Sequence, residues 1–357
     1  MTLIIAEAGV NHNGHEELAF KLIDAAYKAG ADIVKFQTFK ASKLVTANAK
    51  QADYQVTNTQ KKESQLDMLS RLELSFELHL ELVEYCNKLG IEFLSTAFDS
   101  ESLKFLVHDL KLTRLKIPSG DLTNAPLVLE HAQTGCDLIV STGMATLAEI
   151  EIALGVIAFG YVASKTETPS IQAFERAYYS ELGQKMLKEK VTILHCTTEY
   201  PAPLRDINLR AMDTIASAFK LAIGYSDHSA GINIPIAAVA RGAKVIEKHF
   251  TLDKNMEGPD HKASLEPDEL EAMIRGIRDV ELALGDGLKG PMPSEVKNKS
   301  VARKSLVAEQ VITKGTVFSA DNLAIKRPGT GQNPIDYWSL LGCEAKHNYQ
   351  LGDLINE

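Results

Sequence analysis

The sequence predicts an α/β fold, a (β/α)8 TIM barrel followed by a small C-terminal β-rich domain. Eight short runs rich in β-branched residues alternate with longer stretches of helical periodicity, as in βα units around a parallel sheet. These units occupy about 285 residues, and about 250 residues are typical of such a barrel. Beyond them, the glycines, prolines and polar residues of LGDGLKGPMPSEVKNKS indicate a domain boundary.

Each predicted strand is an apolar run, and nearly all of these runs turn polar in their last one to four residues. The runs lie at 3–9, 32–38, 91–96, 113–120, 137–143, 191–196, 221–228 and 244–250. Between them lie predicted helices such as 75–90, where Ser75 can cap the first turn and Gly90 can end the last. The boundary near residue 284 then predicts a barrel over 1–285, a linker over 286–299 and a small domain over 300–357.

Polar residues gather at the ends of the predicted strands. They are Glu7, Lys35, Gln37, Thr96, Lys116, Ser119, Ser141, Ser226, His228, Glu247 and His249. Any one of them could be a hydrogen-bonded core group or the start of a turn. Because the carboxyl ends of barrel strands converge on one mouth, where active sites of this fold sit, we expect them to form one site.

Two segments interrupt the regular spacing. Residues 39–74 follow the second strand, which places them over the mouth, where they could form a lid. Residues 160–190 precede the sixth strand, and we expect them at the opposite face as a helical addition without chemistry. The tail of about 60 residues has too small a core to be strongly stable alone, so docking on a partner surface would help it.

Composition excludes several classes of function. A formal net charge of −9 argues against a nucleic-acid-binding surface. The four cysteines are far apart in the sequence and predict reduced thiols. The N-terminus lacks the basic start of a signal peptide, and no apolar stretch is long enough to span a membrane. We therefore expect a cytoplasmic protein with no membrane partner.

The predicted mouth offers groups for a metal and for an anion. His228 and His249 end neighbouring strands and could share a Zn, Mn, Fe or Co ion, although two hydrogen-bonded histidines would fit equally well. The lysines and hydroxyls could bind a phosphate and a carboxylate, or serve as extended surface lysines and helix caps. Glu7 is a candidate for proton transfer or for aligning a water, or it is a structural carboxylate.

The chain resembles the sialic acid (N-acetylneuraminate) synthase family over essentially its whole length. The matching stretches are IAEAGVNHNG, VKFQTF, LSTAFD, LKIPSGD, STGMAT, LHCTTEYPAP, GYSDHSAG, EKHFTLD, GPDHKAS, VARKSLVA and KRPGTG. The resemblance implies a (β/α)8 barrel with a C-terminal SAF, or antifreeze-like, domain. It also implies a domain-swapped homodimer in which the tail closes the partner's active site.

The resemblance implies a reaction between phosphoenolpyruvate and an N-acylated amino sugar such as N-acetylmannosamine. His228 and His249 would bind a divalent ion, usually manganese, with magnesium or cobalt as alternatives. Glu7 would orient or deprotonate the water that adds to phosphoenolpyruvate. The residues that would hold phosphoenolpyruvate are Lys35, Thr96, Lys116, Ser119, Ser141 and Ser226. Gln37, Tyr200, Asp260 and Arg327 would contact the sugar, Arg327 from the neighbouring subunit.

Two departures from the family pattern bear on the acceptor. Thr198 stands where the family often has Asn, and Asp121 where it often has Glu. Both exchanges shorten a polar side chain beside the expected substrates. The resemblance therefore leaves legionaminate or pseudaminate synthesis from a diacetamido-trideoxyhexose as an alternative. An octulosonate synthase and a non-catalytic carbohydrate- or ice-binding protein are more distant alternatives.

Overall fold

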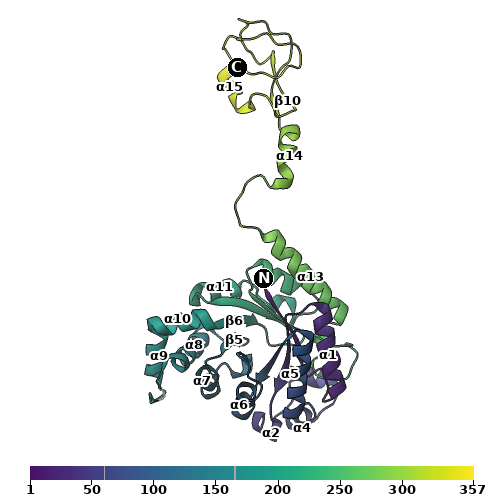
Figure 1. Cartoon of the computed structure of the whole chain (residues 1–357), viewed down its shortest axis with the longest axis vertical. Helices are drawn as coiled ribbons and strands as arrows, with labels where there is room; N and C mark the ends of the chain where they lie inside the picture. Colours follow the sequence, from purple (N-terminus) through teal and green to yellow (C-terminus); the bar gives the residue numbers. More distant parts are fainter. Residues whose placement is uncertain (60, 165) are drawn as a thin grey trace. The chain divides into compact units, whose positions relative to one another are not determined.

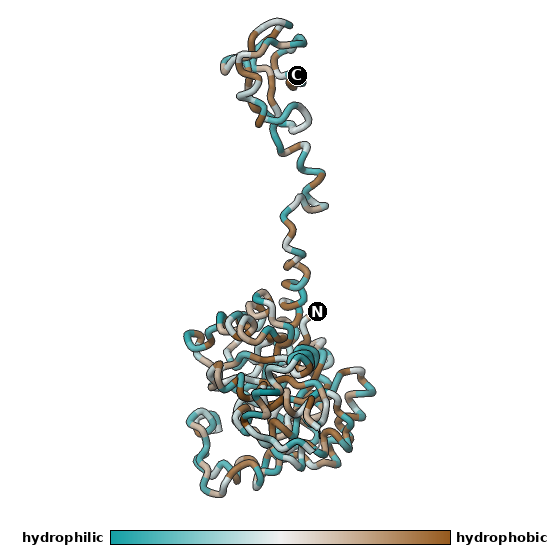
Figure 2. The backbone as a smooth tube through the Cα atoms, turned by 90° about the vertical axis from the view of Figure 1, so that its left-hand side faces the viewer, coloured by the Kyte–Doolittle hydropathy of each residue, from teal (hydrophilic) through white to brown (hydrophobic). Residues whose placement is uncertain are grey.

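The computed structural model describes residues 1–59, 61–164 and 166–357. The chain divides into two compact units, Met1–Gly285 and Asp286–Glu357 (Figure 1). In the barrel unit, hydrophobic stretches of the chain concentrate in the interior (Figure 2). None of the helices in the described ranges combines the length and the apolar character that crossing a membrane requires.

The first unit is a closed barrel of eight parallel strands in sequential order, which confirms the predicted fold class. The strands are β1 (Leu3–Gly9), β2 (Ile33–Thr38), β3 (Glu92–Ala97), β4 (Arg114–Ile117), β5 (Asp137–Ser141), β6 (Val191–Cys196), β7 (Ala222–Asp227) and β8 (Val245–His249). Each matches one predicted run. The alternation of short β-branched runs with helical segments was therefore sufficient to find all eight.

Helices surround the barrel. They are α1 (Glu16–Ala29), α5 (Phe76–Leu89), α6 (Ser100–His108), α7 (Ala125–Gln133), α8 (Leu147–Val162), α11 (Ala211–Phe219), α12 (Asn233–Ala240) and α13 (Pro267–Leu284). The predicted ends of α5 are confirmed, because Ser75 Oγ accepts a hydrogen bond from Leu78 N and Gly90 takes a left-handed conformation with φ of 82°.

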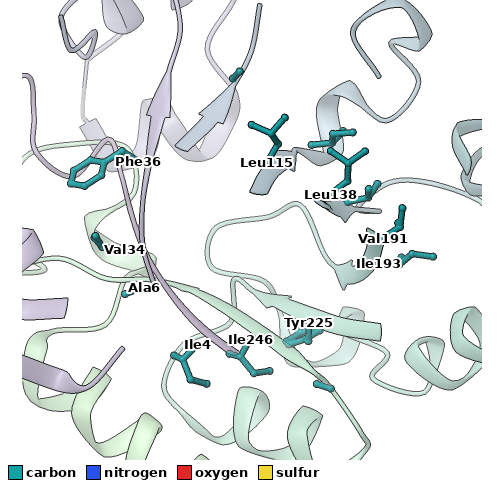
Figure 3. Packing of buried hydrophobic residues seen from close by; sticks show 14 of the residues in the cluster. Ile4, Ala6, Val34, Phe36, Leu115, Leu138, Val191, Ile193, Tyr225 and Ile246 are labelled. Atoms are coloured by element: carbon teal, nitrogen blue, oxygen red, sulfur yellow. The ribbon is translucent and has the colours of Figure 1, made fainter. Parts of the chain in front are cut away.

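Side-chain alternation divides the barrel unit into two apolar layers. Residues that face outward, including Ile4, Ala6, Val34 and Phe36, pack between the strands and the helices (Figure 3). Residues that face inward close the barrel interior with a separate cluster of Ile5, Ile33, Leu94, Ile139, Leu194 and Val245. Two residues further along most of these strands, the inward positions become polar, as at Glu7, Lys35 and Glu247, so the candidate site rests on an apolar floor.

The two predicted insertions contain short helices. Residues 39–74 contain α2 (Ala41–Leu44), α3 (Asp53–Thr59) and α4 (Gln65–Ser70), with residue 60 outside the described ranges. A small apolar cluster of Val10, Phe39, Met68 and Leu72 fixes this segment to the loop after β1. The second insertion forms α9 (Ile171–Tyr179) and α10 (Glu181–Lys190), which pack against α8, and residue 165 is not described.

The second unit has its own small core. Its antiparallel sheet pairs β9 (Ser305–Ala308) with β10 (Leu323–Lys326), and α15 (Tyr337–Leu340) follows. Leu306, Phe318 and Ile355 are among its buried residues. Part of the predicted 286–299 linker is helical, because Pro293 begins α14 (Pro293–Ala302) at a position where proline loses no helical hydrogen bond.

Candidate active site

The inward polar residues line a cavity of about 200 Å³ at the carboxyl ends of the strands. Most of the predicted site residues lie on its wall: Glu7, Lys35, Gln37, Thr96, Lys116, Ser119, Ser141, Thr198, Tyr200, Ser226, His228, Glu247 and His249. Strand alternation explains this arrangement, since Glu7 follows the inward Ile5 by two residues and Glu247 follows Val245 in the same way. The structure thus brings together residues from all eight strands or the loops directly after them.

Two lysines and two glutamates form a buried network at the bottom of the cavity. Lys35 Nζ lies 2.5 Å from Glu7 Oε2 and 3.5 Å from Glu247 Oε2, and Lys116 Nζ lies 3.5 Å from Glu247 Oε1. Ser226 Oγ donates a hydrogen bond to Glu247 Oε1 at 2.7 Å. All four charged side chains are at most 6% exposed, so the two negative charges must be compensated by the two ammonium groups.

The two carboxylates differ because their partners differ. Burial raises the pKa of Glu7 to about 7, against the opposing effect of Lys35. Burial also raises the pKa of Glu247, but Lys116 and Lys35 more than offset it and hold that pKa below its usual range. One carboxylate therefore stays ionised while the other can exchange a proton near neutral pH, an arrangement typical of acid–base sites.

His228 and His249 lie side by side with ring centroids 5.7 Å apart. His228 Nδ1 donates a hydrogen bond to Thr197 O at 2.6 Å, which leaves the lone pair of the neutral ring on Nε2. Burial lowers the pKa of His228 to about 4, and burial together with His228 lowers the pKa of His249 well below its usual value. Both rings are neutral at pH 7.

A neutral imidazole is a good ligand for divalent transition metals. His249 Nδ1 is buried and has no hydrogen-bond partner in the described part of the chain. The pair therefore fits such an ion. Among the described residues, no group of three or more histidine, cysteine, aspartate or glutamate side chains converges on one point, so the other coordination positions would have to be filled by water or substrate, as catalytic metals require.

Gly9 is required by the crowding around these groups. It ends β1 with φ of 52°, at an irregularity in the register between β1 and β2. A Cβ atom there would lie 3.2 Å from Glu7 Oε1 and 3.4 Å from both Gln37 Nε2 and His249 Cε1. Because a side chain would be strained in backbone and in space, glycine at this position leaves room for the side chains of Glu7, Gln37 and His249.

One side of the cavity carries hydroxyl groups that are free to bind a ligand. Ser141 Oγ and Thr198 Oγ1 are buried without a hydrogen-bond partner in the ranges that the structure describes. Ser119 Oγ accepts from Gly143 N at 3.0 Å and also bonds to Cys196 Sγ at 3.1 Å, where either atom could be the donor. Since buried polar groups are normally paired, these groups indicate a polar ligand with several acceptors.

An aromatic column covers the two imidazoles. Tyr200 lies over His228 with ring centroids 4.2 Å apart, and Tyr54 of α3 packs on Tyr200 at 5.1 Å. Asn58, at the end of the same helix, donates a hydrogen bond to Pro259 O at 2.7 Å. The first insertion therefore contributes a wall above the cavity. Tyr54 was not predicted as a site residue, although it lies in the segment predicted to be a lid.

Two predicted site residues of the barrel do not line the cavity, and a third belongs to the second unit. Asp121 belongs to a 3-10 turn (Ser119–Asp121) and accepts a hydrogen bond from Asn124 Nδ2 at 3.0 Å. Asp260 is buried in the loop after β8, where burial raises its pKa to about 6, and its charge contributes to the raised pKa values of Tyr54 and Tyr200. Arg327 is exposed in the second unit, where its Nε donates to Ala302 O at 3.1 Å.

Phe98, directly after β3, lines the cavity but was not predicted as a site residue.

Comparison with known proteins shows the family to which the chain belongs. The model of the NeuB family matches residues 22–289. The chain belongs to the NeuB family. It is 50% identical to the N,N'-diacetyllegionaminic acid synthase of Campylobacter jejuni over 100% of this chain and 99% of that protein. The corresponding enzyme of Legionella pneumophila is 43% identical over 98% of this chain and 92% of that protein.

A solved NeuB-type structure has the same architecture. The N-acetylneuraminic acid synthetase of Leptospira borgpetersenii, in complex with citrate, is 32% identical to this chain. Its TM-score is 0.66, and the match covers 83% of this chain and 90% of that chain. As a member of the NeuB family, this protein is an enzyme, which confirms the resemblance seen in its motifs.

Proposed function

We propose that this NeuB-family enzyme condenses phosphoenolpyruvate with a 2,4-diacetamido-2,4,6-trideoxyhexose, giving a nonulosonic acid of the N,N'-diacetyllegionaminic type and phosphate. The observation that carries the proposal is the cavity of about 200 Å³, in which two lysines, several free hydroxyls, a titratable glutamate and two neutral imidazoles converge. The full-length likeness to two N,N'-diacetyllegionaminic acid synthases favours this acceptor over the N-acetylmannosamine expected first.

Phosphoenolpyruvate would occupy the lysine side of the cavity. Its phosphate and carboxylate are the anions that Lys35 and Lys116 can pair with, while Ser119, Ser141 and Thr96 supply hydrogen bonds. Lys35 Nζ already donates to Thr96 Oγ1 at 3.1 Å, which fixes the ammonium group for this role. The ligand would complete the hydrogen bonding of the hydroxyls that are now unpaired.

Glu7 would take a proton from the attacking water. In the proposed step the π electrons of the C2–C3 bond of phosphoenolpyruvate form a bond from C3 to the sugar aldehyde carbon, and the water oxygen bonds to C2. The aldehyde C=O π bond opens, and its oxygen takes up the proton that Glu7 removed from the water. Phosphate then leaves from C2, and the new hydroxyl at C2 gives its proton to the leaving phosphate as the keto group forms. A pKa of about 7 suits a general base near neutral pH, and Lys35, 2.5 Å away, stabilises the ionised form.

His228 and His249 would hold a divalent ion, which the family resemblance implies is manganese, with magnesium or cobalt as alternatives. When bound, such an ion supplies a Lewis acid that polarises the aldehyde of the open-chain sugar. Glu247 is positioned beside the imidazoles by Ser226 and the two lysines. Its permanent negative charge helps to balance the positive charge that the site would then contain.

The acceptor would lie between the hydroxyl wall and the aromatic column. A trideoxyhexose presents a methyl group at C6 and an additional acetyl group at C4, and both add apolar surface that Tyr54 and Tyr200 can contact. Gln37 and Asp260 would bind its polar groups. The short side chain of Thr198, which lines the cavity, would leave room for the second acetamido group.

The C-terminal unit would act on a neighbouring subunit. The family resemblance implies an SAF domain that would close the partner's barrel in a homodimer, with Arg327 contacting the acyl group of the sugar. The exposed apolar side chains of Ile335 and Trp338, which are 72% and 74% exposed, support a docked tail.

The reaction is tested by phosphate release from phosphoenolpyruvate with purified protein. We expect release to require the diacetamido sugar, to stop on treatment with chelator, and to return on adding manganese, because the aldehyde oxygen needs a Lewis acid. Full activity in excess chelator, with no metal found in the protein, would contradict the mechanism. In His228→Ala and His249→Ala the metal-dependent activity should be lost while the fold is retained.

A further inference from the structure

Next to the two imidazoles, on the opposite face of the same strands, lies a fully buried ion pair. Lys248 Nζ is 2.6 Å from Asp227 Oδ2, and both side chains are 0% exposed. The two residues are register partners on β7 and β8. Asp227 directly precedes His228, and Lys248 directly precedes His249. Because strand residues alternate between faces, the pair points outward toward the helices while the site residues point inward.

The contacts of this pair enclose the backbone of His228. Ser229, which follows His228, donates from N to Asp227 Oδ1 at 3.1 Å and from Oγ to Asp227 Oδ2 at 3.0 Å. Lys248 Nζ also donates to the carbonyl oxygen of Ser229. The ammonium group of Lys248 thus binds the residues on both sides of His228. Lys248 itself directly precedes His249 in the chain.

Barrel stability alone does not account for a charged pair at this place. Ala6, the register partner of Lys248 on β1, is apolar and packs in the outward core, as does Phe36 on β2. Replacing a buried ion pair by apolar side chains of similar volume is often neutral or stabilising, because both charges must be desolvated. What apolar side chains cannot supply is directional bonding between the ends of the two strands.

We propose that the Asp227–Lys248 ion pair is a positioning element that fixes the separation and orientation of the His228 and His249 rings for one divalent ion. The inference rests on the metal site of the proposed function. It assigns to Asp227, Lys248 and Ser229 the role that outer-shell partners have in metal sites, where they orient the ligands without touching the ion.

The test is manganese binding by the full-length protein, measured by electron paramagnetic resonance of free Mn²⁺ together with thermal unfolding. In Asp227→Val/Lys248→Met, which replaces the pair by apolar side chains, we expect an unfolding midpoint at or above that of the wild type. Its dissociation constant for Mn²⁺ should rise by about 10- to 100-fold. Wild-type Mn²⁺ affinity in this folded variant would overturn the proposal.

A matched control and a milder variant accompany this test. Thr38 Oγ1 forms buried hydrogen bonds with Ser95 Oγ at 2.7 Å and with His79 Nε2 at 2.8 Å. Neither bond involves His228 or His249, so Thr38→Val/Ser95→Ala should keep the wild-type Mn²⁺ affinity. If the double variant at Asp227 and Lys248 does not fold, Ser229→Ala removes only one bond of the network and should weaken Mn²⁺ binding by roughly 3-fold or more. An unchanged affinity in Ser229→Ala would then refute the inference.

Wild-type protein that binds no Mn²⁺ would remove the metal from the proposed function, and this inference with it.

Discussion

Glu7 and Glu247 are both inward-facing carboxylates, yet they carry different charges near neutral pH. Glu247 lies within 3.5 Å of both Lys35 and Lys116 and accepts a hydrogen bond from Ser226. Burial raises the pKa of Glu7 to about 7, with Lys35 opposing the shift. This difference in partners supports the proposed roles, a constant electrostatic role for Glu247 and proton transfer for Glu7.

Glu7→Gln tests this assignment. The amide keeps the shape of the side chain but cannot take a proton, so turnover should fall by about 10²-fold or more while phosphoenolpyruvate still binds. Wild-type kcat/KM should rise as the pH increases through about 7, where Glu7 becomes ionised, and this rise should be absent from the variant. Steady-state kinetics and a binding titration measure both effects. Unchanged turnover in Glu7→Gln would remove Glu7 from the chemistry.

Asp260 is predicted to reduce stability at neutral pH. Burial raises its pKa from 3.8 to about 6 in the folded protein, so the folded state binds the proton more tightly than the unfolded state. Its contribution to the free energy of unfolding must therefore fall as the pH rises from about 4 to 6, by on the order of 2 kcal/mol. Asp260→Asn, which mimics the protonated form, should be more stable than the wild type at pH 7.5 and equally stable at pH 4.

Unfolding of the full chain by denaturant at the two pH values measures this effect. Asp279→Asn is the control, because Asp279 is an exposed carboxylate in the middle of α13. Its substitution should change stability equally at both pH values. An Asp260→Asn protein with the same stability as the wild type at pH 7.5 would show that the carboxylate is not penalised by burial. The KM of the Asp260→Asn variant for the acceptor should rise if Asp260 binds the sugar.

At the scale of elements, the strands were predictable because one pattern determines several properties at once. A short run such as 244–250 gives the strand, and its two-residue period gives the inward positions of Val245, Glu247 and His249. The wall above the cavity could not be predicted in this way. Tyr54 lies on a helix of seven residues, and its placement depends on contacts with Tyr200 and, through Asn58, with Pro259. Contacts between residues so distant in sequence leave no local pattern.

Two further features of the site also depend on contacts between residues distant in sequence, and the residue types alone do not predict them. The types Lys, Glu and Ser at strand ends indicated an anion pocket, but the choice between Glu7 and Glu247 as the proton carrier depends on distances to two lysines. The Asp227–Lys248 pair was overlooked because an outward strand position is normally occupied by an apolar core residue. Only the register between β7 and β8 places these two charges together.

At the scale of the whole molecule, the barrel and the C-terminal unit have separate cores, and the catalytic groups discussed above lie in the barrel. Arg327 is the exception among the predicted site residues, since it belongs to the second unit. If that unit closes the barrel of a partner subunit, each active site contains Glu7 from one chain and Arg327 from the other.

This arrangement makes a prediction about mixed dimers. Arg327→Ala should raise the KM of the sugar more than that of phosphoenolpyruvate, because the guanidinium would contact only the sugar. Coexpression of Arg327→Ala with Glu7→Gln should give heterodimers with one intact site and one site carrying both changes. Recovered activity in the purified heterodimer is the expected result. A heterodimer with two impaired sites would place each tail on its own barrel.

The identity of the acceptor is the central claim, and one comparison tests it most directly. Phosphate release from phosphoenolpyruvate is measured with purified, manganese-loaded protein and either the 2,4-diacetamido-2,4,6-trideoxyhexose or N-acetylmannosamine. We predict a kcat/KM at least about 10-fold higher for the diacetamido sugar, the scale of discrimination that small groups in a fitted pocket provide. A higher kcat/KM for N-acetylmannosamine, or no phosphate release with either sugar, would contradict the account.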